Sequence, residues 1–297
     1  MTSFWAMVFA LHLLVNAFAN VYITWLSRRL PKARALVWQY VFAALFTSSW
    51  ALLNGAYEFS GLVFAIGALA AVGSYCQWQA YACAGGLSKT TLFVPLITVW
   101  AALLSALFLS GEELLYRKSW LTIGIVLLHI APFFLARRKA SSETGSSSSF
   151  DLKWLGYTAA MVTIQGGSLF FLKFVSLSHP ITVFFSSWYI GGALGAWLLV
   201  RLCERGQRQL KPREVATIIP SGASVCLALG LLYLVLGAVP AGLVFPLKSF
   251  CAGVLPILPA WFFLNEKREL TASHLIGFAL GLTGVILVVL SQVGVMK

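Results

Sequence analysis

The sequence predicts an all-α integral membrane protein, with ten transmembrane helices arranged as two inverted repeats of five helices. The first observation is composition: 60% of the 297 residues are hydrophobic, 10% are charged and the mean hydropathy is +0.87, whereas a soluble domain has roughly 45–50% apolar and about 25% charged residues. The second is a series of continuous apolar windows, which indicate helices because transmembrane strands alternate in polarity. The third is an internal repeat that relates the two halves of the chain.

Ten apolar windows are long enough to cross a hydrocarbon core of about 30 Å as helices. Glycine, proline and charged residues separate them. They form two groups of five around a polar, serine-rich segment with the composition of a flexible linker. The predicted domains are therefore a first five-helix repeat over 1–136, the linker 137–153 and a second repeat over 154–297. The windows cover 4–26, 36–53, 61–83, 87–109, 120–136, 154–175, 181–202, 215–236, 239–264 and 272–292.

Matching residues recur in the two halves at a nearly constant spacing, which is the signature of an internal repeat. The spacing is the same for the first three pairs and grows only slightly for the last three: Asn16/Gln165, Pro31/Pro180, Tyr40/Tyr189, Pro95/Pro246, Glu113/Glu266 and Gly124/Gly277. Because each unit has an odd number of spans, its two copies must enter the membrane in opposite orientations. Such inverted repeats place a substrate site near the midplane, between the halves.

Two segments carry a resemblance to a known family. VPLITVWAALLSALFLSGEE (94–113) is followed by Gly124, and FPLKSFCAGVLPILPAWFFLNEK (245–267) by Gly277. The chain thereby resembles, over nearly its whole length, the EamA-type transporters of the drug/metabolite transporter superfamily. The resemblance implies movement of a small metabolite, since the superfamily includes carriers of amino acids, nucleotide sugars and S-adenosylmethionine. This chain has Trp38-Gln39-Tyr40 and Ser187-Trp188-Tyr189 where the family typically has an arginine, which indicates a divergent subfamily.

Lys248 is the sharpest functional candidate, because ionisable residues inside a span are costly and usually functional. It lies nine residues into the ninth window, about 13 Å along a helix and near the middle of the membrane. All nine acidic residues lie at or beyond the ends of the windows, so the anionic group of a substrate is the economical partner. The alternative is a structural lysine bonded to carbonyls that Pro246 or Pro256 frees.

Further polar side chains inside the windows are candidates either for a substrate cavity or for packing between helices. In the first window His12, Asn16, Asn20 and Thr24 recur every four residues and share one side of a helix. We rank Asn16, expected to face Gln165, above Asn20 and His12, and Thr24 can bond its own backbone. The other predicted binding residues are Ser74, Gln77, Tyr81, Gln39, Tyr40 and Tyr189, and the predicted gating residues are Pro95 and Pro246.

The predicted function is alternating-access transport of a small polar metabolite with an anionic group, either an amino acid or an amino-acid-derived or nucleoside-type metabolite such as S-adenosylmethionine. The alternative is a proton-coupled drug or cation exporter, which needs a titratable group such as an intramembrane carboxylate, His12 or His129. A channel is disfavoured because the sequence shows neither the charged ring nor the filter-like repeat that a selective pore uses. An intramembrane enzyme is disfavoured by a single Asp and no HExxH signature.

The expected partners are the lipid bilayer and a small molecule, with no cofactor, no metal and no nucleic acid. The net charge of +12 could suggest nucleic-acid binding, but the basic residues occupy short clusters between the windows, as in membrane proteins. Cysteine spacing shows no ligand motif. Gly191 and Gly195 are four residues apart, as close helix packing requires. A monomer or weak homodimer in the bacterial inner membrane is expected.

The distribution of basic residues predicts that both termini lie outside. Sixteen Lys and Arg residues fall in loops on one side and three on the side of the termini, and positive loops stay in the cytoplasm. The family resemblance implies the opposite orientation. We expect a tag at either terminus to be accessible to a membrane-impermeant probe in intact cells. Labelling only after lysis would contradict the charge count.

Overall fold

The computed structural model describes residues 3–83, 90, 94–110 and 152–255, together with isolated helical residues within 123–130 and 276–287. Within these ranges the chain is helical and contains no strand. Six of the helices are long and apolar enough to cross a membrane. The prediction of an all-helical, multi-pass, membrane-embedded protein is therefore confirmed for this part of the chain.

The described helices follow the predicted windows closely in both halves. Windows one to three and six to eight agree with helices to within a few residues, although the eighth is divided in two near Pro220. In the fourth window the described residues are helical at 90 and over Val94–Phe108, and most of 120–136, 137–153 and 272–292 lies outside the described residues. The helices are α1 (Ser3–Ser27), α2 (Lys32–Leu53), α3 (Gly61–Cys83), α5 (Val94–Phe108), α7 (Leu152–Ser178), α8 (Ile181–Cys203), α9 (Pro212–Ala216), α10 (Ile219–Ala238) and α11 (Ala241–Val254).

Proline and glycine set the same boundaries in both halves. Pro31 and Pro180 directly precede α2 and α8, so these helices begin at equivalent positions of the repeat. Proline fits this position because it has no N–H and the first helical turn needs none. After the same two helices the chain turns through Gly55 and Gly206, with φ of 62° and 87°, a left-handed conformation that favours glycine.

Hydrogen bonds and close approaches define the directions of the neighbouring helices. The Ser60 N–H donates to Ser187 Oγ at 2.9 Å, and further along the same two helices Gly195 lies against Ala68, so α3 and α8 run parallel. In contrast, α2 and α8 are antiparallel, because Tyr40 lies beside Tyr189 while Thr47 bonds to the Phe185 carbonyl. Second spans of the two halves thus run in opposite directions.

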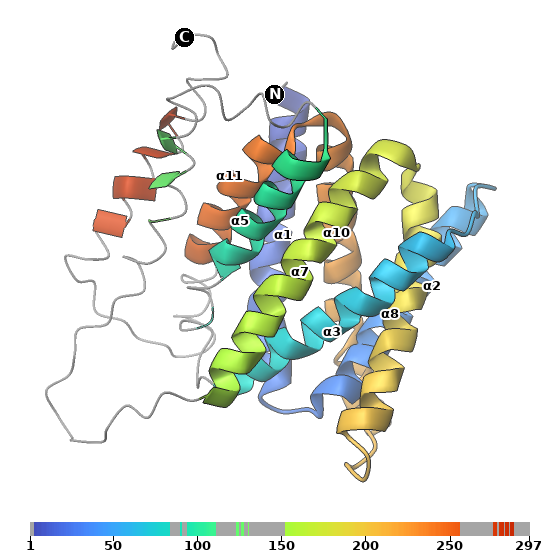
Figure 1. Cartoon of the computed structure of the whole chain (residues 1–297). Helices are drawn as coiled ribbons and strands as arrows, with labels where there is room; N and C mark the ends of the chain where they lie inside the picture. The colour runs from blue at the N-terminus through green and yellow to red at the C-terminus, as the bar shows by residue number, and fades with distance from the viewer. Residues whose placement is uncertain are drawn as a thin grey trace, which may run out of the picture.

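The contacts between helices of different halves come in matching sets. The third span of each half packs against the second and first spans of the other, as α3 with α8 and α7, and α10 with α2 and α1. The fourth span of each half contacts the first span of the other, as α5 with α7 and α11 with α1, and the two fourth spans contact each other. Figure 1 shows α1, α5 and α11 grouped on one side of the bundle, and α2, α3 and α8 on the other.

Glycine allows the backbones of α3 and α8 to approach each other. A Cβ atom on Gly191 would collide with the backbone of Phe64, and one on Gly195 with that of Ala68. On the opposite helix, a Cβ on Gly67 would collide with the carbonyl of Trp188. The predicted packing role of Gly191 and Gly195 is confirmed, and it joins the two halves of the chain.

Gly191→Ala is expected to destabilise the protein by about 1–3 kcal/mol, since the added methyl group must push two packed helices apart. Gly156→Ala is the matched control, because open space surrounds Gly156 on α7 and alanine favours a helix. Thermal unfolding in detergent should show a lower Tm for the first variant alone. Equal behaviour of the two variants would contradict the assigned contact.

Candidate functional site

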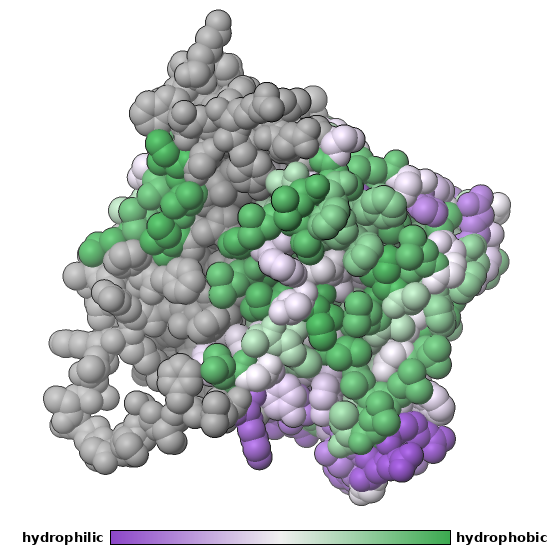
Figure 2. All heavy atoms as spheres, in the orientation of Figure 1, coloured by the Kyte–Doolittle hydropathy of each residue, from purple (hydrophilic) through white to green (hydrophobic). Residues whose placement is uncertain are grey.

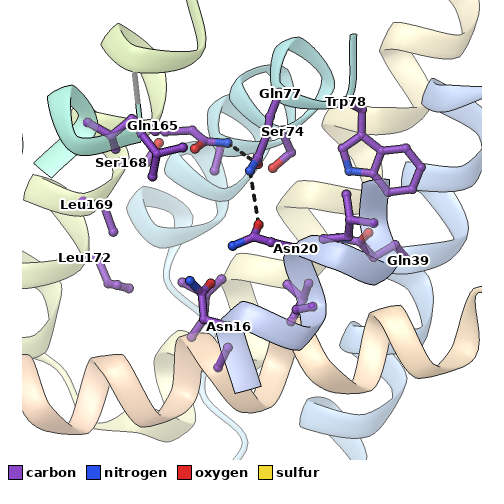
Figure 3. Close-up of a pocket in the computed structure, with 18 of the residues that line it drawn as sticks. Asn16, Asn20, Gln39, Ser74, Gln77, Trp78, Gln165, Ser168, Leu169 and Leu172 are labelled. Atoms are coloured by element: carbon purple, nitrogen blue, oxygen red, sulfur yellow. Dashed lines mark hydrogen bonds between the residues drawn. The ribbon is translucent and has the colours of Figure 1, made fainter. Parts of the chain in front are cut away.

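A central cavity of about 170 Å³ lies between the helices of the two halves. Side chains from α1, α2, α3, α5, α7, α8, α10 and α11 line it. Figure 3 shows amide side chains from α1, α3 and α7 directed toward one another across this space. The cavity lies between the two halves, where the sequence predicts a substrate site.

Eight of the eleven predicted binding residues line this cavity, and three lie behind its wall. The lining residues are Asn16, Asn20, Gln39, Tyr40, Ser74, Gln77, Gln165 and Lys248. His12, Tyr81 and Tyr189 are absent from the lining and are almost fully buried. Pro95 and Pro246 fall within α5 and α11, where their side chains lie outside the described part of the structure.

Gln77 joins three helices through one amide group. Its Nε2 donates to Tyr81 Oη at 2.8 Å. The same Nε2 donates to Asn20 Oδ1 at 3.4 Å, and the Oε1 accepts from Gln165 Nε2 at 2.8 Å (Figure 3). The first bond is within α3, while the other two reach α1 and α7. One wall of the cavity is therefore a connected set of amides, which holds its members in fixed orientations.

Asn16 and Gln165 are both cavity residues, as expected, but no hydrogen bond among the described residues joins their side chains. The side-chain bond of Gln165 goes to Gln77 on α3. Figure 3 shows Asn16 on α1, away from the dashed contacts that join Asn20, Gln77 and Gln165. The interposed third span is the reason, because α3 packs against α7 in this bundle.

The three predicted residues outside the lining support it from behind. Tyr81 accepts the bond from Gln77, and the His12 Nδ1 lies 2.8 Å from the carbonyl oxygen of Ala228, a lining residue. Tyr189 lies with its ring centroid 6.5 Å from that of Tyr40. Thr24 donates to the Asn20 carbonyl at 2.8 Å, so the expectation that Thr24 bonds its own helix is confirmed.

Two further polar pairs fix the cavity wall formed by α2. Tyr40 Oη and Ser74 Oγ are 3.0 Å apart, which links α2 to α3. Ser221 Oγ donates to Gln39 Oε1 at 3.0 Å, which links α10 to α2. Interhelical bonds of this kind are typical of polar residues in membrane bundles. Gln39 and Tyr40 thus serve both the packing and the cavity.

Lys248 is the sole charged residue among the described residues that line the cavity, and none of them carries a carboxylate. Lys173 provides a direct contrast within the same protein. It is 4% exposed, and its ammonium donates to the Leu236 carbonyl at 2.7 Å and to the Val239 carbonyl at 3.2 Å. Lys173 is therefore a structural lysine that carbonyl oxygens satisfy. This is the role that was the alternative for Lys248.

Sequence reasoning overlooked Lys173, although a signal was present. The residue lies two positions before the end of the predicted window 154–175. A basic side chain near a span end can reach the carbonyls that helix C-termini leave without intrahelical partners. Lys248 is farther from both ends of its window, which is the difference that separates the two lysines.

The positions that line the cavity repeat along the chain with the spacing of the internal repeat. On α1 and α7 four lining pairs share one spacing, that of Pro31 and Pro180: Asn16/Gln165, Ala19/Ser168, Asn20/Leu169 and Ile23/Leu172. On α3 and α10 three lining pairs share the spacing of Pro95 and Pro246: Ser74/Val225, Gln77/Ala228 and Trp78/Leu229. Equivalent faces of equivalent helices therefore enclose the cavity.

The side chains on these equivalent faces differ in chemistry. Ser74 and Gln77 on α3 are polar, whereas their counterparts Val225 and Ala228 on α10 are apolar. On the fourth spans, Ile97 of α5 and Lys248 of α11 occupy equivalent positions of the repeat, and both line the cavity. The cavity thus has an amide wall, an apolar wall and one cationic side chain. Among the described residues no group of His, Cys, Asp and Glu is placed to hold a metal.

Comparisons with known proteins address the fold. The sequence matches no protein-family model and no curated protein. Seventeen chains of solved structures match it. One of them, a crystal structure of a protein, has a TM-score of 0.74 at 16% identity and covers 98% of this chain and 99% of its own length. At that identity the similarity shows a shared fold over nearly the whole chain.

Gln77→Leu is expected to lower stability by about 1–3 kcal/mol, because the amides of Asn20 and Gln165 lose a partner inside the bundle. The matched control is Gln79→Leu. Gln79 is on the same helix, and its amide donates to Tyr75 Oη, four residues earlier, at 2.7 Å. Thermal unfolding in detergent should separate the variants. A drop in Tm as large for the control would mean that the link between helices adds nothing.

Proposed function

We propose that the protein is an alternating-access transporter that binds a small polar metabolite with an anionic group in the central cavity between its two halves. The candidate metabolites are an amino acid, or an amino-acid-derived or nucleoside-type compound such as S-adenosylmethionine. The observation that carries the proposal is the cavity itself: both halves line it, and Lys248 is the sole charge among its described lining residues.

The arrangement of the helices supports an inverted repeat. If one half is inverted relative to the other, the two second spans, α2 and α8, must run antiparallel, as they do. The third span α3 must then run parallel to α8, and the contacts between halves must come in matching sets, as is also found. The spacing of the lining residues adds independent support, since it groups the same helix faces around one axis. Rocking of one half against the other around a central site is how such repeats give alternating access.

The charge of the cavity supports an anionic substrate group. An ammonium inside a membrane is costly unless it has a partner, and no carboxylate belongs to the described lining. The amide wall can donate further hydrogen bonds to a carboxylate, while Leu169 and Leu229 offer apolar contacts to the remainder of a substrate. A cationic drug would meet a like charge here, so the same observation weighs against a cation exporter.

The size of the cavity favours a small metabolite. Its volume of about 170 Å³ is below the roughly 300–1,000 Å³ typical of sites for drug-sized ligands. An amino acid suits this state of the cavity better than a nucleotide sugar. The resemblance to EamA-type transporters agrees with such a substrate. In that scheme Pro95 and Pro246, at equivalent positions of α5 and α11, supply the helix distortion that gating requires.

A substrate can be sought first by thermal shift of the purified protein with amino acids, nucleosides, S-adenosylmethionine and nucleotide sugars, because a ligand that binds the folded state stabilises it. A compound that raises Tm should then show saturable counterflow in proteoliposomes. Linear flux without counterflow would indicate a channel and contradict the proposal.

Lys248→Met is expected to weaken substrate affinity and counterflow by about 10- to 100-fold, since a charge-assisted hydrogen bond is lost. Its Tm without ligand should not fall. Lys173→Met is the contrasting variant: it should lower Tm because two carbonyls lose their donor, while the folded fraction keeps its affinity. Unchanged kinetics in Lys248→Met would remove this residue from the mechanism.

A further inference from the structure

A second groove, of about 480 Å³, lies at the end of the bundle where α2 begins and α8 ends. Three arginines and two tryptophans define it: Arg34 and Trp38 on α2, Trp197 and Arg201 on α8, and Arg205 in the following loop. None of the described residues that line it also lines the central cavity. The proposed transport function leaves it without a role.

The acids nearest to this groove in sequence already have hydrogen-bond partners. Glu204 is 2% exposed, and its carboxylate accepts the backbone N–H groups of Ala33 and Arg34 at 3.0 and 3.2 Å. Glu214 accepts both terminal nitrogens of Arg208 at 2.6 and 2.7 Å. The guanidinium groups that line the groove therefore keep a surplus of positive charge.

The guanidinium of Arg34 has an unmet hydrogen-bonding group. Its Nε is buried and has no hydrogen-bond partner among the described residues, although a buried donor without an acceptor costs free energy. Arg201 lies over the Trp197 ring at 5.0 Å from the ring centroid, an arrangement that orients the guanidinium. Because Glu204 holds the start of α2 against the end of α8, these arginines are positioned before any ligand arrives.

The groove combines two features of a membrane interface, exposed tryptophan side chains and clustered basic residues. Trp38 and Trp197 are 39% and 44% exposed, and tryptophan collects at the level of lipid headgroups. Figure 2 shows a strongly hydrophilic cluster at the lower right of the molecule, directly below an apolar surface. The described loops at this end of the bundle carry Arg28, Arg29, Arg205, Arg208 and Lys211. The positive-inside rule therefore assigns this end to the leaflet that is rich in anionic lipid in the cell.

We propose that this groove binds the phosphate headgroup of an anionic phospholipid. Arg34, Arg201 and Arg205 contact the phosphate oxygens, while Trp38 and Trp197 flank the region where the headgroup joins the acyl chains. Arginine suits this role because its planar fork pairs with phosphate oxygens in a bidentate manner. The bound lipid would bridge α2 and α8, the second spans of the two halves.

The full-length protein in neutral detergent provides the test, with phosphatidylglycerol, phosphatidylcholine or inorganic phosphate added. Native mass spectrometry and thermal shift should both report tighter binding of phosphatidylglycerol than of phosphatidylcholine, and no stabilisation by inorganic phosphate. Equal binding of the two lipids would overturn the proposal. Stabilisation by inorganic phosphate equal to that by phosphatidylglycerol would make the groove a site for soluble anions and would equally overturn it.

Arg201→Gln and Arg205→Gln should each weaken phosphatidylglycerol binding about tenfold, the effect expected for a lost charge-assisted hydrogen bond. Both side chains are exposed, so these variants should fold even if Arg34→Gln does not. The matched control is Arg29→Gln, because Arg29 also lies over a tryptophan, 4.2 Å from the Trp25 ring centroid, yet does not line the groove. An equal loss in the control would indicate diffuse surface attraction and contradict a specific site.

Discussion

The approach of α3 to α8 is the contact on which the rest of the bundle depends. Gly67, Gly191 and Gly195 leave the seam without a Cβ at its closest points, so the third span of one half lies against the second span of the other at backbone distance. In lipid there is no hydrophobic force between helices, so close packing of small residues and interhelical hydrogen bonds must hold them together. With this seam closed, α1 and α7 lie against α10 and α3, and these four helices enclose the cavity together with α2, α5, α8 and α11.

Because little water reaches the inside of the bundle, polar side chains there need hydrogen-bond partners from the protein. Lys173 donates to two carbonyls at the end of α10, and the amide of Gln77 bonds to Tyr81, Asn20 and Gln165. These groups are satisfied by the protein and contribute to the fold. Lys248 belongs to a different class, because its ammonium faces a cavity whose described lining offers amides and hydroxyls but no carboxylate. In the proposed function, this ammonium is the group that supplies binding energy for the anionic part of a ligand.

The sequence predicts most of the described helices and most of the polar residues that line the cavity. The residues it places wrongly share one cause. Apolar windows bounded by Pro31, Pro180 and the turn glycines locate helices because the bilayer fixes their length and composition. The polar stripe on α1 predicts cavity residues as a set. It cannot separate Asn20, which lines the cavity, from His12, which bonds to Ala228 behind it, because that choice depends on how α10 packs against α1. Periodicity gives the face of a helix, whereas the neighbour on that face is a tertiary property.

If the protein is the proposed transporter, equivalent positions with unlike side chains would let one bundle serve both sides of a membrane. In each of the pairs Ile97/Lys248, Asn20/Leu169 and Gln77/Ala228, one half has a polar or charged residue and the other half has an apolar residue at the equivalent position. In the proposed transport cycle, a backbone with matching halves supplies two equivalent ways to open, one toward each side. The unlike side chains then fix the orientation of the substrate relative to the chain, with its anionic group at α11 in both states. Equivalent helices would move, while the contacts that recognise the substrate stay the same throughout the cycle.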